Sequence, residues 1–255
     1  MHILVTNDDG VYAPGLLALA KELRKVGKVT VVAPDRNWSA SGHVKTLSRP
    51  LRVKEVELAD GSPARACDGA PSDCVALACM GLLEDPVDLI VSGINPNANF
   101  GHDVTYSGTV TAAMEAIIWN LPGVAVSLDA PEYHQGGLDS KTAADVGANV
   151  AKKVWDKKRP KNTSLNVNVP YGSMEKLNGY RVTKLGLRVY HDRLVKRKDP
   201  QGRPYYWIGG EAPTGVPDEG TDIGALSQSY VSVTPLSLDM TAYDFKEALS
   251  GWDFE

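Results

Sequence analysis

Two adjacent carboxylates are the first residues of the chain that could do chemistry. Asp8 and Asp9 lie between Asn7 and Gly10, directly after a short apolar run. Neighbouring carboxylates repel each other unless a cation neutralises them, and oxygen ligands of this kind suit Mg²⁺ or Mn²⁺. Because Asn, Asp and Gly also favour turns, the tetrapeptide alone indicates either a metal site or a simple turn.

Two more oxygen donors lie in later polar segments and could complete such a site. Ser39 offers a hydroxyl after the apolar run 29–33, and Asn95 offers an amide oxygen after the apolar run 88–92. Ser39 is a weak signal on its own, because serines are common in surface loops. Both residues are therefore candidate ligands for a divalent metal ion beside the carboxylate pair.

The segment 93–107 leads into small polar residues that suit an anion. Ser107, Gly108 and Thr109 precede apolar residues at helical spacing, and the free N–H groups of a helix start attract negative charge. Helix capping by Ser107 or Thr109 is the simpler explanation of this tripeptide taken alone. Asn99, in the same segment, is a further candidate for holding phosphoryl oxygens.

A carboxylate pair and an anion-binding helix start meet the requirements of metal-assisted phosphoryl transfer if they share one edge of a sheet. His43 and His102 lie in the same polar segments, where a histidine can contact a phosphate or protonate a leaving group. A surface role is favoured for His102, whereas both interpretations stay open for His43.

The spacing of apolar residues predicts the elements that would bring these groups together. Short apolar runs at 2–6, 29–33, 88–92 and 123–128 alternate with helical patterns at 14–26, 71–83 and 107–118. Such alternation is typical of a parallel sheet with right-handed crossovers. Ligands of these sheets bind outside the carboxyl ends of the strands, which is where the polar segments begin.

The pattern changes after a fourth helical segment at 143–154. Polar alternation indicates a strand at 164–169 and an antiparallel ribbon at 180–190. Residues 191–228 combine Gly, Pro and charge with Tyr205, Tyr206 and Trp207, so we expect either an extended hairpin that docks on a partner subunit or a flexible surface loop. A last strand at 230–233 and a terminal helix at 242–249 complete the chain.

The predicted fold class is therefore α/β, with a mostly parallel sheet, flanking helices, an extended C-terminal β-hairpin and a tail helix. We expect residues 1–170 to form the catalytic core. Residues 171–255 are expected to form a β-rich part with the hairpin and the tail, which serves oligomerisation.

Composition argues against several classes of protein. The 255 residues carry a formal net charge of -4, without the basic surplus of proteins that bind polymeric nucleic acid. No run approaches the roughly 18 apolar residues of a membrane helix, and the first apolar run is too short for a signal peptide. Cys67, Cys74 and Cys79 lack C-x-x-C spacing, which predicts reduced thiols in a cytoplasmic protein.

Several motifs in order along the chain resemble the SurE family of survival-protein-E nucleotidases. They are ILVTNDDG, DRNWSASGH, SGIN followed by N-x-G-x-D-V, YSGTVTAAME, LNVNVP and YVSVTPLSLD. The resemblance runs from residue 2 to about residue 240, so it is far more specific than any single motif. One departure is Asn97, at a position where the family often has Gly; Asn also tolerates the left-handed conformation.

The resemblance implies a 5′- and 3′-nucleotidase that needs a divalent metal ion. It implies metal ligation by Asp8, Asp9, Ser39 and Asn95. It also implies a Rossmann-like core, with the C-terminal hairpin and tail exchanged between the subunits of a homodimer or homotetramer.

The predicted reaction is hydrolysis of a nucleoside monophosphate to nucleoside and phosphate. Asp8 or Asp9 would orient or deprotonate a water, while Asn99 and the helix start would hold the phosphoryl oxygens. Three alternatives stay open: an aspartyl-phosphate intermediate, a metal-dependent glycosyltransferase that uses nucleotide-sugars, and a non-catalytic nucleotide-binding module. A dinucleotide oxidoreductase is disfavoured because no G-x-G-x-x-G follows the first apolar run.

Overall fold

A nine-stranded sheet forms the centre of the protein, seen here in a computed structural model that describes residues 1–131, 137–157 and 162–253. The strand order is β3-β4-β2-β1-β5-β6-β7-β11-β8, and the six strands from β4 to β7 are parallel. The strands of this sheet are β1 (His2–Thr6), β2 (Lys28–Pro34), β3 (Val53–Glu57), β4 (Pro63–Cys67), β5 (Leu89–Asn95), β6 (Gly123–Asp129), β7 (Thr163–Pro170), β8 (Tyr180–Val182) and β11 (Val231–Ser237). The fold class is the α/β class that the sequence predicts.

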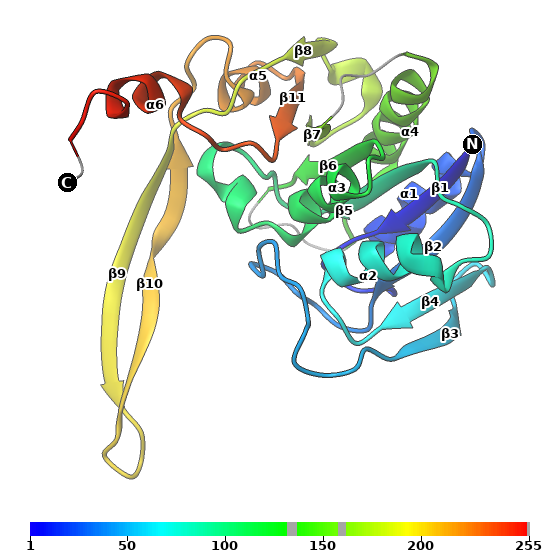
Figure 1. Ribbon diagram of the computed structural model, residues 1–255, viewed down its shortest axis with the longest axis horizontal. Helices are drawn as coiled ribbons and strands as arrows, with labels where there is room; N and C mark the ends of the chain where they lie inside the picture. The colour runs from blue at the N-terminus through cyan, green and yellow to red at the C-terminus, as the bar shows by residue number, and fades with distance from the viewer. Residues whose placement is uncertain (132–136, 158–161, 254–255) are drawn as a thin grey trace.

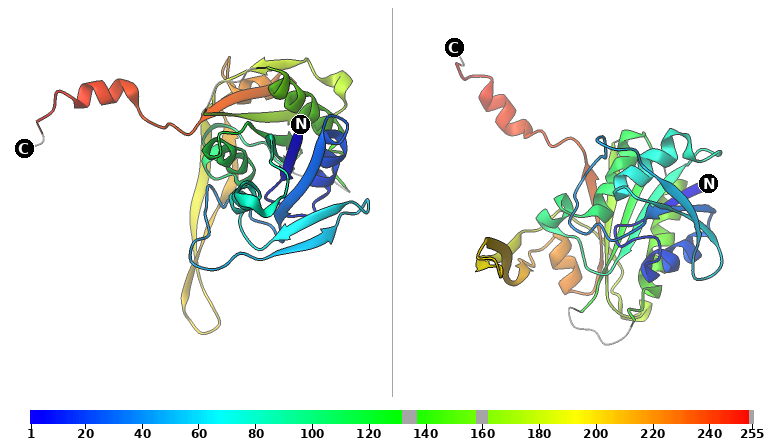
Figure 2. Two further views of the ribbon diagram at one scale, coloured as in Figure 1. Left: turned by 45° about the vertical axis from the view of Figure 1, so that its right-hand side comes forward. Right: turned by 90° about the horizontal axis from the view of Figure 1, so that it is seen from below.

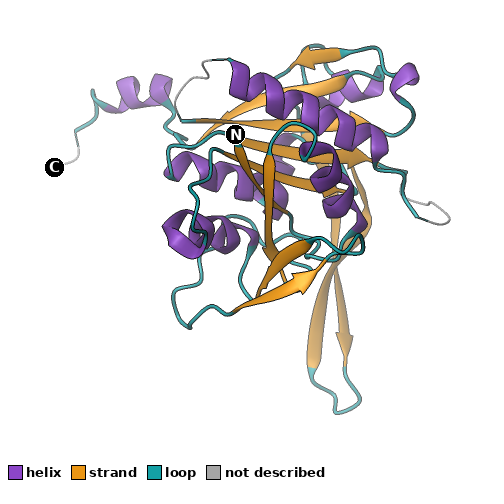
Figure 3. Cartoon of the chain, turned by 90° about the vertical axis from the view of Figure 1, so that its right-hand side faces the viewer, coloured by secondary structure: helices purple, strands orange, loops and turns teal. Residues whose placement is uncertain are grey.

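Helices cover both faces of this sheet (Figures 1 and 3). On one face α1 packs against α4, and on the other α2 packs against α3. The helices are α1 (Pro14–Leu23), α2 (Pro71–Leu77), α3 (Gly108–Ile118), α4 (Lys141–Asp156), α5 (Asp222–Ser227) and α6 (Tyr243–Leu249), with short helical turns at Ala78–Leu82, Gly101–Thr105 and Met174–Lys176. Among the described residues, none of these helices is long and apolar enough to cross a membrane.

The first strand shows why the sheet is covered on both sides. Ile3 and Val5 belong to the core beneath α1 and α4, whereas Leu4 belongs to the core on the side of α2 and α3. Successive side chains of a strand point to opposite faces, so a strand with apolar side chains on both faces needs a cover on each face. This run therefore specifies a central strand.

The segment 180–190 differs from the expected antiparallel ribbon. Its first part, β8, pairs in parallel with β11 at the edge of the main sheet, and only its last residues enter β9 (Arg188–Lys198). Local alternation cannot reveal this difference, because the pairing partner lies some 50 residues further on and is chosen by tertiary packing. Helix α5 was not expected either, since it is a short helix within a segment dominated by Gly, Pro and charge.

The extended hairpin is present and projects from the body of the protein (Figures 1 and 2). It consists of β9 and β10 (Pro204–Gly215), paired antiparallel with Trp207 opposite Val195. Helix α6 also stands away from the sheet (Figure 2). Trp207 and Ile208 are 64% and 84% exposed in the single chain, so the hairpin presents uncovered apolar surface of the kind that marks interaction sites.

Candidate functional site

Asp8 lies at the carboxyl end of the central strand β1 and is only 3% exposed. The Thr109 hydroxyl donates a hydrogen bond to Asp8 Oδ1, and the backbone N–H groups of Gly108 and Thr109 also interact with this carboxylate. Burial raises the pKa of Asp8, and the hydrogen bond from Thr109 opposes that rise. The start of α3 therefore orients the first carboxylate of the pair.

The close approach between α3 and Asp8 requires a glycine at position 108. A Cβ atom on Gly108 would lie 2.8 Å from Asp8 Cβ and 3.0 Å from the Ser41 hydroxyl. Ser107 is the N-cap of α3, and its hydroxyl accepts a hydrogen bond from Val110 N at 3.1 Å. The capping interpretation of Ser107 is thus confirmed, and the same residue also faces the pocket described below.

Asp9 is less buried than Asp8, and its pKa is raised. Burial, and then the charge of Asp8, raise the pKa of Asp9 to about 6. A carboxylate pair with this property is the electrostatic signature expected of a site that gains a cation.

A pocket of about 370 Å³ opens where the segments after β1, β2 and β5 meet α3. Five of the residues singled out from the sequence line it: Asp8, Ser39, Asn95, Asn99 and Ser107. The carboxyl ends of parallel strands meet at one edge of a sheet, and this topology brings together residues that are about 100 positions apart. Four of the other candidates, Asp9, Gly108, Thr109 and His43, are not among the lining residues.

The donor set at this edge fits a hard divalent cation. Asp8, Asp9, Ser39 and Asn95 supply two carboxylates, a hydroxyl and an amide oxygen, which are the ligands that Mg²⁺ and Mn²⁺ prefer. The Asn95 amide nitrogen donates to the carbonyl of Asn97, so Asn95 Oδ1 is the atom left to face a cation. The described residues contain no group of three or more His, Cys, Asp and Glu side chains that could hold a metal, so any site here depends on neutral oxygens as well.

Asn99 is held in place by strands β6 and β7. Its backbone N–H donates to Asn168 Oδ1 at 2.8 Å, and its carbonyl accepts from Asn166 Nδ2 at 2.7 Å. Its side-chain nitrogen donates to Ser127 Oγ at 2.8 Å. Two buried asparagines of β7 thus fix the loop that carries Asn99. The sequence pattern alone did not assign them this supporting role.

His43 is paired with a buried glutamate rather than with the pocket. His43 Nε2 lies 2.7 Å from Glu115 Oε2, and Trp119 Nε1 donates to Glu115 Oε1 at 3.1 Å. The Glu115 side chain is 3% exposed. This contact anchors the segment after β2, which carries Ser39, to the body of α3.

Asp103, Tyr106 and Arg188 are among the pocket residues that were not sequence-derived candidates. Asp103 follows Asn99 within the same polar segment, so its position in the sequence could have identified it as a candidate site residue. Arg188 begins the hairpin strand β9, more than 80 residues further along the chain. No local pattern distinguishes it from the other basic residues of the hairpin.

A second cavity of about 620 Å³ adjoins the first and shares Asn97, Ala98 and Arg188 with it. Phe100, Pro213 and Leu138 contribute apolar walls, and Asp129 contributes a carboxylate. The two cavities together give a smaller compartment lined by Asp8 and Asp103 next to a larger one with several apolar walls. This arrangement suits a ligand with a charged group at one end and a flat or apolar body at the other.

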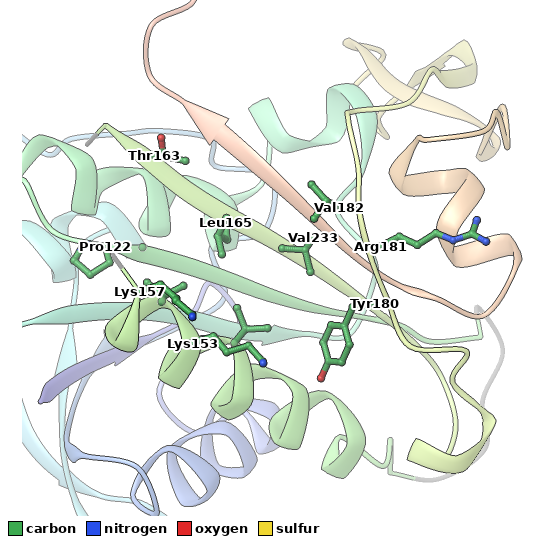
Figure 4. Close-up of a pocket in the computed structure, with 12 residues that line it drawn as sticks. Pro122, Lys153, Lys157, Thr163, Leu165, Tyr180, Arg181, Val182 and Val233 are labelled. Atoms are coloured by element: carbon green, nitrogen blue, oxygen red, sulfur yellow. The ribbon is translucent and has the colours of Figure 1, made fainter. Parts of the chain in front are cut away.

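A different hollow near the amino ends of β6 and β7 has none of these features (Figure 4). Val150, Leu165 and Val233 form its floor, with Lys153 and Lys157 beside them. None of its described lining residues is acidic. In parallel α/β sheets the ligand site lies at the carboxyl ends of the strands, so this hollow is not the candidate site.

Comparison with known proteins places the chain in one family. Residues 3–192 match the model of the family described as survival protein SurE. A protein named 5′-nucleotidase SurE from Herpetosiphon aurantiacus is 55% identical over 98% of this chain and 97% of its own length. Another of the same name from Chloroflexus aggregans is 51% identical over the full length of both chains.

A solved structure agrees with these sequence matches. The crystal structure of the SurE protein from Aquifex aeolicus superposes with a TM-score of 0.82, at 40% identity and with 98% of each chain covered. The two relatives and this structure cover nearly the whole chain, whereas the family model ends at residue 192, before β11. The chain therefore belongs to the SurE family.

Proposed function

We propose that this protein is a metal-dependent phosphomonoesterase that hydrolyses nucleoside 5′-monophosphates, and also 3′-monophosphates, to nucleoside and phosphate. The observation that carries the proposal is the pocket that gathers Asp8, Ser39, Asn95 and Ser107 at the carboxyl ends of the strands. The full-length relatives named 5′-nucleotidase support the same substrate class.

One divalent ion, Mg²⁺ or Mn²⁺, would be held by Asp8, Asp9, Ser39 and Asn95. Such an ion polarises a phosphoryl oxygen and lowers the pKa of a bound water. Thr109 fixes the orientation of Asp8 through its hydroxyl. Trp38 N donates to the Asp8 carbonyl at 2.7 Å, which ties the segment that carries Ser39 to the carboxylate pair.

The remaining residues bind the phosphoryl group and accept the proton of the attacking water. Ser107 and Asn99 line the pocket as neutral hydrogen-bonding groups for phosphoryl oxygens, while Gly108 and Thr109 give the helix start its close approach. Asp8 or Asp9 would orient or deprotonate the attacking water. The second cavity accommodates the nucleoside.

The reaction takes place in the cytoplasm, in a homodimer or homotetramer. The three thiols Cys67, Cys74 and Cys79 are free, as is usual in a reducing compartment. The exposed apolar residues of the hairpin support an assembly of several copies.

The test is phosphate release from 5′-AMP and 3′-AMP by the wild type and by Asp8→Asn, with a nucleotide-sugar as a third substrate. We expect release from both nucleotides and a loss of at least about 100-fold in Asp8→Asn, since the metal loses one charged ligand. Turnover of the nucleotide-sugar alone would favour a glycosyltransferase. Binding of AMP without turnover would favour a nucleotide-binding module.

A further inference from the structure

Arg188 places a positive charge at the border between the two cavities. It is the first residue of β9, at the root of the projecting hairpin (Figure 1). It lines both the pocket with Asp8 and the neighbouring cavity with Phe100. Among the described residues that line the first pocket, it is the only lysine or arginine. A substrate that spans the two cavities must therefore pass its guanidinium group.

The Arg188 guanidinium contacts two neighbouring side chains, those of Asp103 and Phe100. Arg188 Nε lies 2.8 Å from Asp103 Oδ2, and the guanidinium carbon lies 4.5 Å from the centre of the Phe100 ring. Tyr190 donates its hydroxyl to Asp103 Oδ1 at 2.7 Å, so Asp103 is itself fixed. The Arg188 side chain is only 14% exposed. These contacts restrain the side chain before any ligand arrives.

The terminal nitrogens of Arg188 are left for a ligand. Within the part of the chain that the structure describes, Asp103 is the only carboxylate within 4 Å of this guanidinium, and Asp129 interacts with Arg188 electrostatically at longer range. Arg181 shows what a structural arginine looks like in the same protein: it stacks at 3.7 Å on Tyr230 and donates from Nη1 to Gln228 at 2.9 Å. A fork of N–H donors without protein acceptors matches the geometry of a phosphate group.

We propose that Arg188 contacts the substrate and binds the phosphoryl oxygens through its terminal N–H groups. Asp103, Phe100 and Tyr190 keep the side chain in position for this contact. The proposal rests on the proposed function, because it assigns Arg188 to the phosphate of the same substrate. It also means that the hairpin root, and not only the strand ends of the core, supplies part of the phosphate site.

The test is calorimetric titration of the Mg²⁺-loaded protein with inorganic phosphate and, separately, with adenosine. We expect Arg188→Gln and Arg188→Ala to bind phosphate about 10- to 100-fold more weakly, which corresponds to losing one or two charge-assisted hydrogen bonds. Arg188→Lys keeps the charge and should recover part of the affinity. Adenosine affinity and the thermal unfolding midpoint should stay close to those of the wild type.

Arg181→Gln is the matched control, since it removes an arginine on an aromatic ring beside the distant apolar hollow (Figure 4). It should leave phosphate binding unchanged. Unchanged phosphate affinity in Arg188→Gln, or a wild type that binds no phosphate, would overturn the proposal. So would an equal loss for phosphate and adenosine, which indicates a structural role, or a loss for adenosine alone. A wild type that binds phosphate through Arg188 but releases none from AMP would refute the nucleotidase and leave this contact standing.

Discussion

At the scale of single residues, the carboxylate pair and the glycine beside it carry most of the account. Asp8 is almost fully buried beneath the start of α3, and Asp9 is half-buried next to it. Each ionised carboxylate raises the energetic cost of ionising the other, unless a cation compensates. The site is therefore built to be more favourable with a metal ion than without one.

The pKa of Asp9 gives a prediction about pH. Burial and Asp8 raise this pKa to about 6 from its ordinary value of 3.8, so the metal-free folded protein binds a proton that the unfolded chain has already lost. Its stability should then fall as the pH rises from about 4 to about 6, and level off above that. Thermal unfolding in EDTA across this range measures it, and a stability that rises instead would contradict the assignment.

The same proton competes with the metal ion. Metal affinity should weaken about tenfold for each pH unit below 6, because one proton must leave Asp9 on binding. Calorimetry with Mn²⁺ between pH 5 and 7 provides the slope. In Asp9→Asn the Mn²⁺ affinity should be lower at every pH in this range, and the pH dependence caused by Asp9 should disappear. An unchanged dependence of affinity on pH would point to a different titrating group.

Gly108 gives a steric prediction. In Gly108→Ala the new methyl group meets Asp8 Cβ at 2.8 Å, so the carboxylate or the helix must move. We expect a loss of about 1–3 kcal/mol in the free energy of unfolding from overpacking. Phosphate release should fall by about 100-fold because a catalytic group is displaced. Gly137→Ala, where a Cβ would meet no atom within 4 Å, is the control; similar behaviour of the two variants would argue against the tight contact.

At the scale of elements, the loop after β2 is held by a contact between His43 and the buried Glu115. His43 Nε2 and Glu115 Oε2 are 2.7 Å apart, and Lys45 Nζ lies 3.8 Å from the other oxygen of Glu115. Because the loop also carries Ser39, the position of a metal donor depends on this contact with α3. His43 is thus placed to position the loop.

This arrangement predicts how His43→Ala should behave. A buried glutamate that loses its partner costs about 1–3 kcal/mol of stability, and the loosened loop should raise KM while kcat changes by only a few-fold. A general acid would instead lose about 100- to 10,000-fold in kcat. Steady-state kinetics separates the two roles, with His102→Ala as an exposed control in a neighbouring loop.

Sequence patterns predicted the elements of the core because the signals are local. Strand β1 is apolar at three of its five positions and α3 follows a capped start, so both were recognisable without the fold. The edge position of β8, the buried asparagines of β7 and the placement of Arg188 depend on pairing between distant segments. Such tertiary pairings leave no mark in a window of a few residues.

At the scale of the whole molecule, the hairpin and the tail expose apolar side chains that no other part of the same chain buries. Leu194 and Ile208 face each other across the hairpin and are 74% and 84% exposed. Apolar side chains this exposed on a projecting ribbon favour contact with another copy. The root of the same hairpin carries Arg188, so the proposed assembly surface and the pocket share one element.

This gives a prediction about assembly. The wild type should sediment as a dimer or tetramer, and Ile208→Glu should shift it toward smaller species because a charge replaces an apolar contact. Circular dichroism should stay unchanged, since Ile208 makes little contact within its own chain. Val182→Glu, equally exposed at 82% but on β8, serves as the control; a monomeric wild type would contradict the oligomer.

The central claim is that the oxygen-rich pocket at the carboxyl ends of the strands holds a metal ion that drives phosphate release. The most direct measurement is the rate of phosphate release from 5′-AMP by the wild type, first after treatment with EDTA and then with Mg²⁺ or Mn²⁺ restored. The account predicts that EDTA abolishes release and that either metal restores it. Full activity in EDTA, or no release from a folded protein with any divalent metal, would contradict it.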